Sequence, residues 1–296
     1  MKLAVSGASG FVGSELVPAL RAEGHDVLSL VRREPEAPGE IRWNPGAGTL
    51  DPSDLAGVEA IVCLSGATLN RRWTDTYKRE ILESRVGTTS LLARTAATLD
   101  PPPKVFLCAS AVGAYGLRGD EILTEESERG SGFLADVVLK WEAAAEPARE
   151  AGVRVVNFRH GIVLGKGGAL QQMLLPFKLG LGGRIGTGRQ WWSWVHAADL
   201  TAAYSFALRT ELDGAVNLVS PNPVTNEQLT RALGEALRRP TVLPVPTLAL
   251  KLRFGGEMAE ELLLGGQRAL PARLLDAGFQ YSAAEIGVAL ERALQK

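Results

Sequence analysis

The chain has 296 residues, 46% of them hydrophobic, and its 32 basic residues nearly balance its 33 acidic ones. A chain of this length buries a full core without cross-links, so its stability requires no disulfide. The near-zero net charge, with no block of like charge, argues against nucleic acid or an anionic membrane surface as a partner. We expect a small molecule instead.

We expect neither a secretory leader nor a membrane span. The first residues enter directly a stretch broken by Gly and Ser, and no later apolar run reaches the roughly 18 residues that a span requires. The two cysteines, Cys63 and Cys108, lie in apolar runs typical of buried strands, where a thiol behaves as a small hydrophobic group. These features predict a soluble protein in the reducing cytoplasm.

The first half alternates short β-branched apolar runs with longer helical patterns. We expect strands at 2–6, 26–32, 60–65, 104–109 and 153–158, and helices at 11–23, 74–99 and 133–151. Continuous apolar strands separated by helices are typical of a parallel sheet covered on both faces. The predicted fold class is therefore α/β, a Rossmann-like doubly wound parallel sheet.

The pattern changes after Gly161. Glycines gather in GKGGAL and KLGLGGRIGTGRQ, and prolines gather between 240 and 246, which predicts loops that build a second lobe. A helical pattern at 197–208 and a strand pattern at 214–219 predict that part of 190–219 rejoins the sheet, and 247–295 is mostly amphipathic helix. We expect a dinucleotide-binding domain over 1–164 and a smaller, mainly helical C-terminal substrate lobe over 165–296.

Three glycines follow the first expected strand with GxxGxxG spacing. Gly7 permits a tight turn, Gly10 lets the backbone approach a pyrophosphate, and Gly13 lets the helix pack on the strand. The helix start offers free amides and a positive dipole end to the phosphates. This context predicts dinucleotide binding, with three structural glycines as the alternative. The expected contacts are Gly7, Ala8, Ser9, Gly10, Phe11, Val12 and Gly13.

The end of the second strand, about 20 residues after this turn, carries an acidic residue where NAD is bound. Here the chain reads Arg32-Arg33. Guanidinium groups form forked bonds with a 2′-phosphate, so the pair predicts NADP(H), and a solvated strand end is the alternative. Ligands lie outside the carboxyl ends of parallel strands. The next two strand ends should therefore border the cofactor at Leu64, Ser65, Gly66, Ala67 and Ala109.

Further motifs make the chain resemble the extended short-chain dehydrogenase/reductase family, which includes the nucleotide-sugar epimerases. They are Ser110 followed by AVGAYG, Thr124-Glu125-Glu126, Arg159-His160-Gly161, Val163-Leu164-Gly165 and WVHAADL at 194–200. More narrowly, the chain is similar to an atypical subgroup of epimerase family proteins with a C-terminal helical segment of its own. This similarity rests on Arg71-Arg72-Trp73, LESR at 82–85, 133–142, Gly188-Arg189-Gln190 and GGEMA at 255–259.

Ordinary members of that family use a Tyr-x-x-x-Lys pair, in which the lysine lowers the pKa of the tyrosine so that it acts as acid or base. No tyrosine of this chain is followed by lysine at that spacing. Alignment on Glu142 puts Leu134 and Val138 at the two positions. Neither side chain transfers a proton.

The asparagine typical of the preceding helix is also replaced, because Arg85 stands in the corresponding segment, SRVGT at 84–88. We expect Arg85 to reach the cofactor or an anionic substrate. Glu80 lies a little over one turn earlier, where it would bond a ribose or orient Arg85. A surface ion pair is the alternative for both residues.

Three side chains remain as candidates for chemistry. Ser110 keeps the position of the family's serine, which hydrogen-bonds a substrate carbonyl or hydroxyl, and a strand-end cap is the alternative. Tyr115 is a nearby acid whose pKa should stay near about 10 without a lysine. His160 follows a strand and is a candidate general acid, with a solvated loop histidine as the alternative. We expect no metal site, because the other histidines are scattered and the cysteines are buried.

An aromatic and cationic cluster is expected beside these residues. It comprises Trp191, Trp192 and Trp194 with Arg184 and Arg189, and the stretch Arg71-Arg72-Trp73 is expected to approach the same mouth. Such a cluster suits an apolar or ring-bearing substrate with a negative group. Core packing of the tryptophans and an exposed helix start at 71–73 are the alternatives.

Together these features predict an NADP(H)-dependent oxidoreductase or epimerase-like enzyme for a small carbonyl, hydroxyl or nucleotide-sugar-like compound, with Ser110 polarising the reacting oxygen. Loss of the tyrosine and lysine leaves a second interpretation open, a non-catalytic NADP(H)-binding redox sensor or regulator. Isomerisation of a nucleotide sugar on tightly held NAD is a third, which Arg32 and Arg33 weaken. By analogy with the family, a homodimer would pair through the helices at 74–99 and 133–151.

Overall fold

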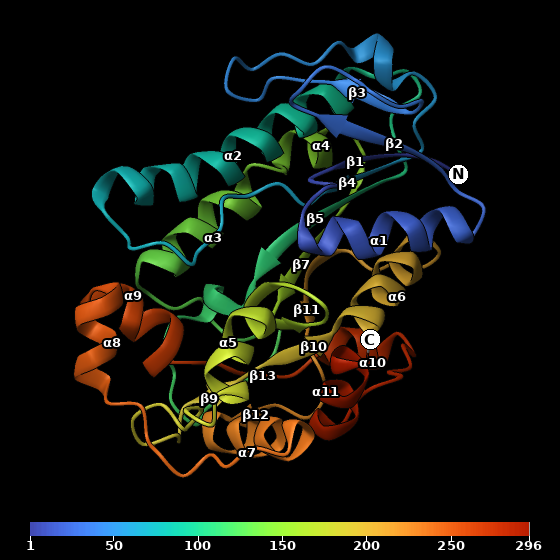
Figure 1. Cartoon of the computed structure of the whole chain (residues 1–296). Helices are drawn as coiled ribbons and strands as arrows, with labels where there is room; N and C mark the ends of the chain where they lie inside the picture. The colour runs from blue at the N-terminus through green and yellow to red at the C-terminus, as the bar shows by residue number, and fades with distance from the viewer. Residues whose placement is uncertain (296) are drawn as a thin grey trace.

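The computed structural model describes residues 1–295, and its centre is a seven-stranded parallel sheet (Figure 1). The strand order is β11-β7-β5-β4-β1-β2-β3. The strands are β1 (Lys2–Ser6), β2 (Asp26–Val31), β3 (Glu40–Arg42), β4 (Ala60–Cys63), β5 (Val105–Ala111), β7 (Arg154–His160) and β11 (Gly214–Leu218). The order reverses between β1 and β4, which is where doubly wound sheets bind ligands. The predicted fold class is confirmed.

Helices cover both faces of the sheet (Figure 1). One face carries α1 (Phe11–Ala22) and α6 (Ala197–Leu208), and the other carries α2 (Asp75–Thr98), α3 (Phe133–Ala143) and α4 (Glu146–Glu150). Successive residues of a strand point to opposite faces, so Leu3 and Val5 join the core under α1 while Ala4 joins the core under α2. Burial on both faces explains why the strands read as unbroken apolar runs.

The helix expected over 133–151 is two helices, because the chain turns between α3 and α4. Pro147 lies in the first turn of α4 and has no amide hydrogen, so it cannot continue the hydrogen bonding of α3. The other long elements begin and end within a few residues of expectation. The two thiols are free and buried on adjacent strands, with Cys63 directly beside Cys108.

Beyond residue 164, two elements belong to the main sheet. α6 packs on its face, and β11 pairs with β7 at its edge. The other strands there form separate two-stranded sheets, in which β9 (Trp191–Trp192) pairs with β12 (Val224–Thr225) and β10 (Trp194–His196) pairs with β8 (Ile162–Leu164). Part of the segment 190–219 was expected to rejoin the sheet. Its last strand, β11, does so by pairing with β7. The domain boundary after residue 164 remains a prediction.

The C-terminal lobe has a hydrophobic core of its own. α5 (Gly168–Lys178), α7 (Asn226–Leu237) and α11 (Ile286–Leu294) meet there through Leu170, Leu233 and Leu290. The segment between α7 and α11 is broken into short pieces rather than long helix. These are α8 (Thr247–Phe254), α9 (Gly256–Ala259), η3 (Glu260–Leu264), β13 (Arg268–Ala269), which pairs with β6 (Ile122–Leu123), and α10 (Ala272–Asp276). Gly255, with φ +92°, ends α8.

Arg273 of α10 fastens this segment to the edge of the sheet. Its guanidinium donates to the carbonyl oxygens of Asp213 and Ala215 at the start of β11, and to the carboxylate of Glu126 at 2.7 Å. Its backbone amide donates to Glu125, which also accepts the amide of Asn217 at 2.9 Å. The motif of residues 124–126 therefore joins the C-terminal segment to the sheet.

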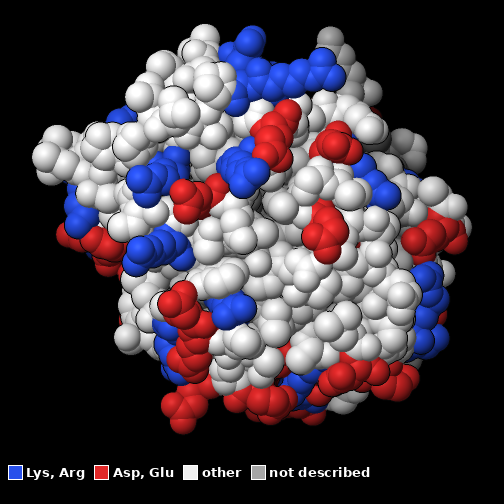
Figure 2. Space-filling view, turned by 90° about the horizontal axis from the view of Figure 1, so that it is seen from below, with Lys and Arg blue, Asp and Glu red and all other residues white. Residues whose placement is uncertain are grey.

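Figure 2 shows the lower end of the molecule in Figure 1, where α7, α8 and α11 lie, and acidic and basic side chains are mixed around broad uncharged areas of this face. Among residues 1–295, no helix combines the length and the hydropathy that crossing a membrane requires.

Candidate functional site

The glycine turn after β1 has the steric properties that a bound diphosphate requires. Gly7 has φ +72°, and a Cβ on it would lie 2.9 Å from the carbonyl group of Leu64. A Cβ on Gly13 would overlap the carbonyl oxygen of Gly7 and lie 2.7 Å from the backbone of Ala8. Both positions therefore need glycine. The first turn of α1 has no side-chain cap and no acidic residue, so its amides are free for an anion.

Phe11 has a neighbour that the sequence did not indicate. Its ring lies against the glycine-rich segment after β8, where a Cβ on Gly165, Gly167 or Gly168 would approach the ring to between 2.6 and 3.0 Å. These glycines were interpreted as markers of a loop. Their role in the fold is to let this loop close over Phe11 at the start of α1.

The two arginines after β2 have different environments. Arg33 donates to both carboxylate oxygens of Glu40, at 2.8 and 2.6 Å, and this hydrogen bond is the main reason that the pKa of Glu40 is lowered to about 2. Within residues 1–295, the exposed side chain of Arg32 has neither a hydrogen bond nor an ion pair. Arg32 is therefore free to meet a phosphate, whereas Arg33 already has a partner.

A cavity of about 380 Å³ opens at the carboxyl ends of β4 and β5. It extends from Val12 of the glycine turn past Leu64, Ser65, Gly66 and Ala109 to Ser110 and His160. Ala67 is not part of the lining. Its amide donates to Ser84 and its carbonyl oxygen accepts from Arg85. The cavity therefore brings together Val12, the strand ends after β4 and β5, and two of the three catalytic candidates, whereas the lining does not include Gly7, Ala8, Ser9, Gly10, Phe11 or Gly13.

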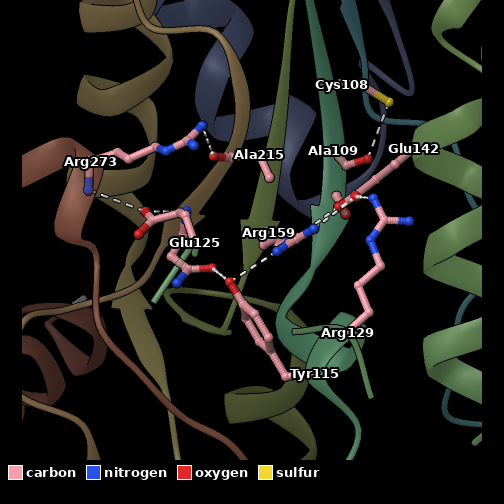
Figure 3. A network of polar contacts seen from close by, with 11 residues as sticks. Cys108, Ala109, Tyr115, Glu125, Arg129, Glu142, Arg159, Ala215 and Arg273 are labelled. Atoms are coloured by element: carbon pink, nitrogen blue, oxygen red, sulfur yellow. Dashed lines mark hydrogen bonds and ion pairs between the residues drawn. The ribbon is translucent and has the colours of Figure 1, made fainter. Parts of the chain in front are cut away.

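Ser110 is hydrogen-bonded to the buried ion pair of Glu142 and Arg159, which Figure 3 shows with Arg129 beside it. Its hydroxyl donates to Oε1 of Glu142 at 2.7 Å. The same carboxylate accepts Nε and Nη2 of Arg159 at 2.8 and 2.9 Å, and Nη2 of Arg129 at 3.0 Å. An ionised carboxylate has no proton to donate, so the hydrogen of Ser110 points to Glu142. The oxygen of Ser110 is left free to accept a hydrogen bond.

Tyr115 does not fit the role of a nearby acid. Its side chain is fully buried in the core and its hydroxyl donates to Asn217 at 2.7 Å while accepting Nη1 of Arg159 at 3.0 Å (Figure 3). Burial is the largest cause that raises the pKa of Tyr115 above its usual value. The cavity lining does not include it. Tyr115 instead links the 3-10 turn after β5 to β7 and β11 within the fold.

His160 lines the cavity in surroundings that disfavour its protonated form. Its Nε2 lies 3.0 Å from the hydroxyl of Tyr204, and the two rings meet edge to face. Burial lowers the pKa of His160 to about 4, so the imidazole is neutral at pH 7. This lowered pKa disfavours a protonated donor at pH 7, and the role of His160 as a general acid stays a prediction. Leu134 and Val138 also line the cavity and add apolar surface.

Arg85 lines the cavity, whereas Glu80 does not. The Arg85 guanidinium donates to the carbonyl oxygens of Ile81 and Ala67, both at 3.0 Å, and its Cζ lies 5.1 Å from the ring centre of Trp141. Glu80 is exposed on another side of α2 and, within residues 1–295, forms no bond to Arg85. The structure does not support Glu80 as a partner of Arg85 or as a residue of the cavity.

The C-terminal segment supplies the outer wall of the cavity. Glu261 of η3 accepts the amides of Phe133 and Leu134, each at 2.8 Å, and so caps α3, whose own N-cap has no side chain. Gln267 lines the same cavity and donates to the carbonyl oxygen of Gly116 at 2.7 Å. Sequence reasoning missed this cap because about 130 residues separate the partners and no local pattern links them.

The aromatic cluster is brought together only in part. Trp191 and Trp192 line the cavity, and the indole of Trp191 donates to Asp120 at 2.7 Å below the guanidinium of Arg268. Trp194 is fully buried core. The lining does not include Arg184, Arg189, Arg71, Arg72 or Trp73. Among residues 1–295, no group of His, Cys, Asp and Glu side chains is placed to hold a metal ion.

The sheet order, the glycine turn and the cavity at the strand ends define a Rossmann-like fold of the dinucleotide-binding class. The model of the NAD dependent epimerase/dehydratase family matches residues 3–218, and a domain of unknown function, DUF1731, matches residues 245–293. The chain belongs to this epimerase/dehydratase family and carries the extra C-terminal domain. The predicted family resemblance is confirmed.

Individual relatives match nearly the whole chain. Epimerase family protein Mb2239 of Mycobacterium bovis is 44% identical over 97% of this chain and 96% of its own length. The crystal structure of human epimerase family protein SDR39U1 with NADPH has a TM-score of 0.90 and 37% identity, covering 99% of both chains. A nucleoside-diphosphate sugar epimerase from Corynebacterium glutamicum, also 37% identical, has a TM-score of 0.82 over 99% of this chain and 58% of that longer chain.

Proposed function

We propose that the chain binds NADP(H) and acts as an oxidoreductase or epimerase-like enzyme on a small carbonyl or hydroxyl compound. The observation that carries this proposal is the cavity that joins Val12 of the glycine turn to Ser110 at the strand ends. The NADPH in the structure of the human relative supports the choice of cofactor. The free amides at the start of α1 suit its diphosphate, and the unpaired Arg32 suits its 2′-phosphate.

The bound cofactor would supply the redox chemistry, because NADPH would give a hydride to a carbonyl compound and NADP⁺ would take one from a hydroxyl compound, while the protein supplies binding and orientation. The oxygen of Ser110 is available to accept a hydrogen bond from a substrate hydroxyl, because the hydrogen of Ser110 is directed to Glu142. Donation to a substrate carbonyl requires that the hydroxyl hydrogen turn away from Glu142. Ser110 therefore orients a hydroxyl compound without any change in the ion pair behind it, and its contribution to rate is positioning.

The first test is a fluorescence titration of the purified protein with NADPH and with NADH. We expect tighter binding of NADPH, and Arg32→Ala should weaken it about tenfold or more while leaving NADH unchanged, because a charged hydrogen bond to phosphate is lost. Arg33→Ala is the matched control, since Arg33 is already paired with Glu40, and its effect should be smaller. Failure of the wild type to bind either nucleotide would overturn the proposal.

A second candidate is a non-catalytic NADP(H)-binding redox sensor or regulator. Leu134 and Val138 in the cavity wall and the low pKa of His160 favour it, because none of these groups delivers a proton at neutral pH. A screen of carbonyl and hydroxyl compounds for absorbance change at the nicotinamide band separates the two candidates. Turnover that Ser110→Ala abolishes supports the enzyme, and tight NADPH binding without turnover supports the sensor.

We further propose a small-molecule partner, a cytoplasmic location and, by family analogy alone, a homodimer through α2 and α3. Sedimentation equilibrium of the purified chain tests the last point. A monomer at all accessible concentrations would contradict it.

A further inference from the structure

Arg85 occupies an unusual position for a cation, because the surroundings of its guanidinium in the cavity wall are largely apolar. Ile81, Val138 and Trp141 line the cavity with it, and the face of the Trp141 ring lies against its guanidinium. A Cβ added to Gly66 would come within 3.2 Å of its Cζ, so the strand end at Gly66 packs directly on the head group. The guanidinium is therefore fixed in place by its neighbours.

The charge of Arg85 has no counter-ion within residues 1–295. Its two hydrogen bonds go to backbone carbonyl oxygens, which carry partial charges only. Burial lowers the pKa of Arg85 to about 10, which still leaves the group charged at neutral pH. Arg159, by contrast, is buried against both oxygens of Glu142. A half-buried cation without a counter-ion in an apolar wall is costly, and such an arrangement points to a partner that arrives from outside.

The hydrogen-bond inventory of Arg85 indicates the shape of that partner. A guanidinium has five N–H groups, and two of those of Arg85 are used within the protein. Glu261 is the acidic residue of the cavity lining, and both of its oxygens accept amides of α3. One free cation in an apolar wall balances one negative charge, and a forked guanidinium matches the two oxygens of a planar carboxylate.

We propose that the substrate of this site is a small monocarboxylic acid with an apolar body, whose carboxylate pairs with Arg85 while its reacting oxygen meets Ser110. This inference rests on the proposed function, because it names the substrate class of the same cavity. Arg85 lies on α2 and donates to the carbonyl oxygen of Ala67 in the loop after β4, whereas Ser110 lies at the end of β5, and both residues line the same cavity. One ligand in this cavity can therefore meet Arg85 from α2 and Ser110 from the end of β5.

The test compares two ligands of nearly the same shape, the anion 3-phenylpropanoate and the neutral 3-phenylpropanamide, by calorimetric titration of protein saturated with NADP⁺. We expect the acid to bind the wild type about tenfold or more tightly than the amide, as a charge-assisted pair requires. In Arg85→Met this preference should fall to about twofold or less, and Arg85→Lys should keep part of it. Arg94→Met, an exposed arginine of the same helix, is the control and should keep the full preference.

Each other outcome is decisive. Equal binding of acid and amide to the wild type, or binding of neither, would overturn the proposal. Loss of NADP⁺ affinity in Arg85→Met would overturn it as well, because Arg85 would then serve the cofactor. If Arg85→Met does not fold, the comparison of acid with amide on the wild type still tests whether the cavity prefers a carboxylate. If the wild type does not bind NADP⁺, the proposed function fails, and the same two ligands on the nucleotide-free protein still test the charge preference.

Discussion

The two ends of the cavity are built by different means. At the end nearest the glycine turn, which lines the cavity through Val12, backbone geometry dominates, because Gly7 and Gly13 allow the turn to pack closely and the first turn of α1 has no side-chain cap. At the end nearest Ser110, side chains from distant parts of the chain dominate, because Glu142 is bonded to Ser110, Arg159 and Arg129. The first end depends on a short local sequence, and the second on long-range ionic contacts. A substitution should therefore affect either nucleotide binding or stability first, according to the end at which it lies.

The largest effect on stability is expected at the Ser110 end. Glu142→Gln removes the charge that Arg159 and Arg129 share, and breaking a buried ion pair costs about 3 to 5 kcal/mol of unfolding free energy. Denaturant unfolding followed by circular dichroism measures it. The exposed pair of Arg231 and Glu235 supplies the control, since Glu235→Gln should cost less than about 1 kcal/mol. Similar losses in the two variants would show that the buried network is not a main support of this end.

The stability of the protein should also depend on pH, because His160 at the Ser110 end of the cavity has a lowered pKa. The pKa of His160 is lowered to about 4 in the folded chain from its ordinary value of 6.5, so the unfolded state binds the proton more readily. Stability is complete above pH 6.5 and falls as the pH drops toward 4, by about 3 kcal/mol over that range. The difference between wild type and His160→Gln, which can still bond Tyr204, isolates this contribution. An unchanged slope in that variant would contradict the low pKa of His160.

At the glycine-turn end, binding should fail before the fold does. Gly13→Ala forces a methyl group against the carbonyl oxygen of Gly7, and such overpacking costs about 1 to 3 kcal/mol. The displaced turn should lose NADPH binding in the titration while the protein remains folded. Gly87→Ala is the control, because a Cβ there meets nothing within 4 Å and alanine favours a helix, so stability should rise slightly. Retained NADPH affinity in Gly13→Ala would separate the turn from the nucleotide.

The difference between the two ends also explains what the sequence could predict. The parallel sheet, the glycine turn and the strand ends at Leu64 and Ala109 follow from local patterns, and these features agree with the structure. The burial of Tyr115 depends on Asn217 and Arg159, which lie far away in the chain, and no local pattern reports such contacts. The role of Glu142 could not be predicted from local sequence either. The family alignment was anchored on this residue, but nothing in the sequence indicated that its carboxylate accepts the hydroxyl of Ser110.

The smallest expected effect tests whether the C-terminal domain belongs to the Ser110 end. Glu261 caps α3 from that domain, and Glu261→Ala should lower stability by about 1 kcal/mol, as loss of a helix cap does. Lys78→Met breaks the exposed contact with Glu257 of the same domain and should cost less. Because Glu261 also lines the cavity and caps α3, its loss should change 3-phenylpropanoate binding while NADPH affinity stays unchanged. A loss of NADPH affinity instead would mean that the C-terminal wall supports the whole cavity, and the division between its two ends would not hold.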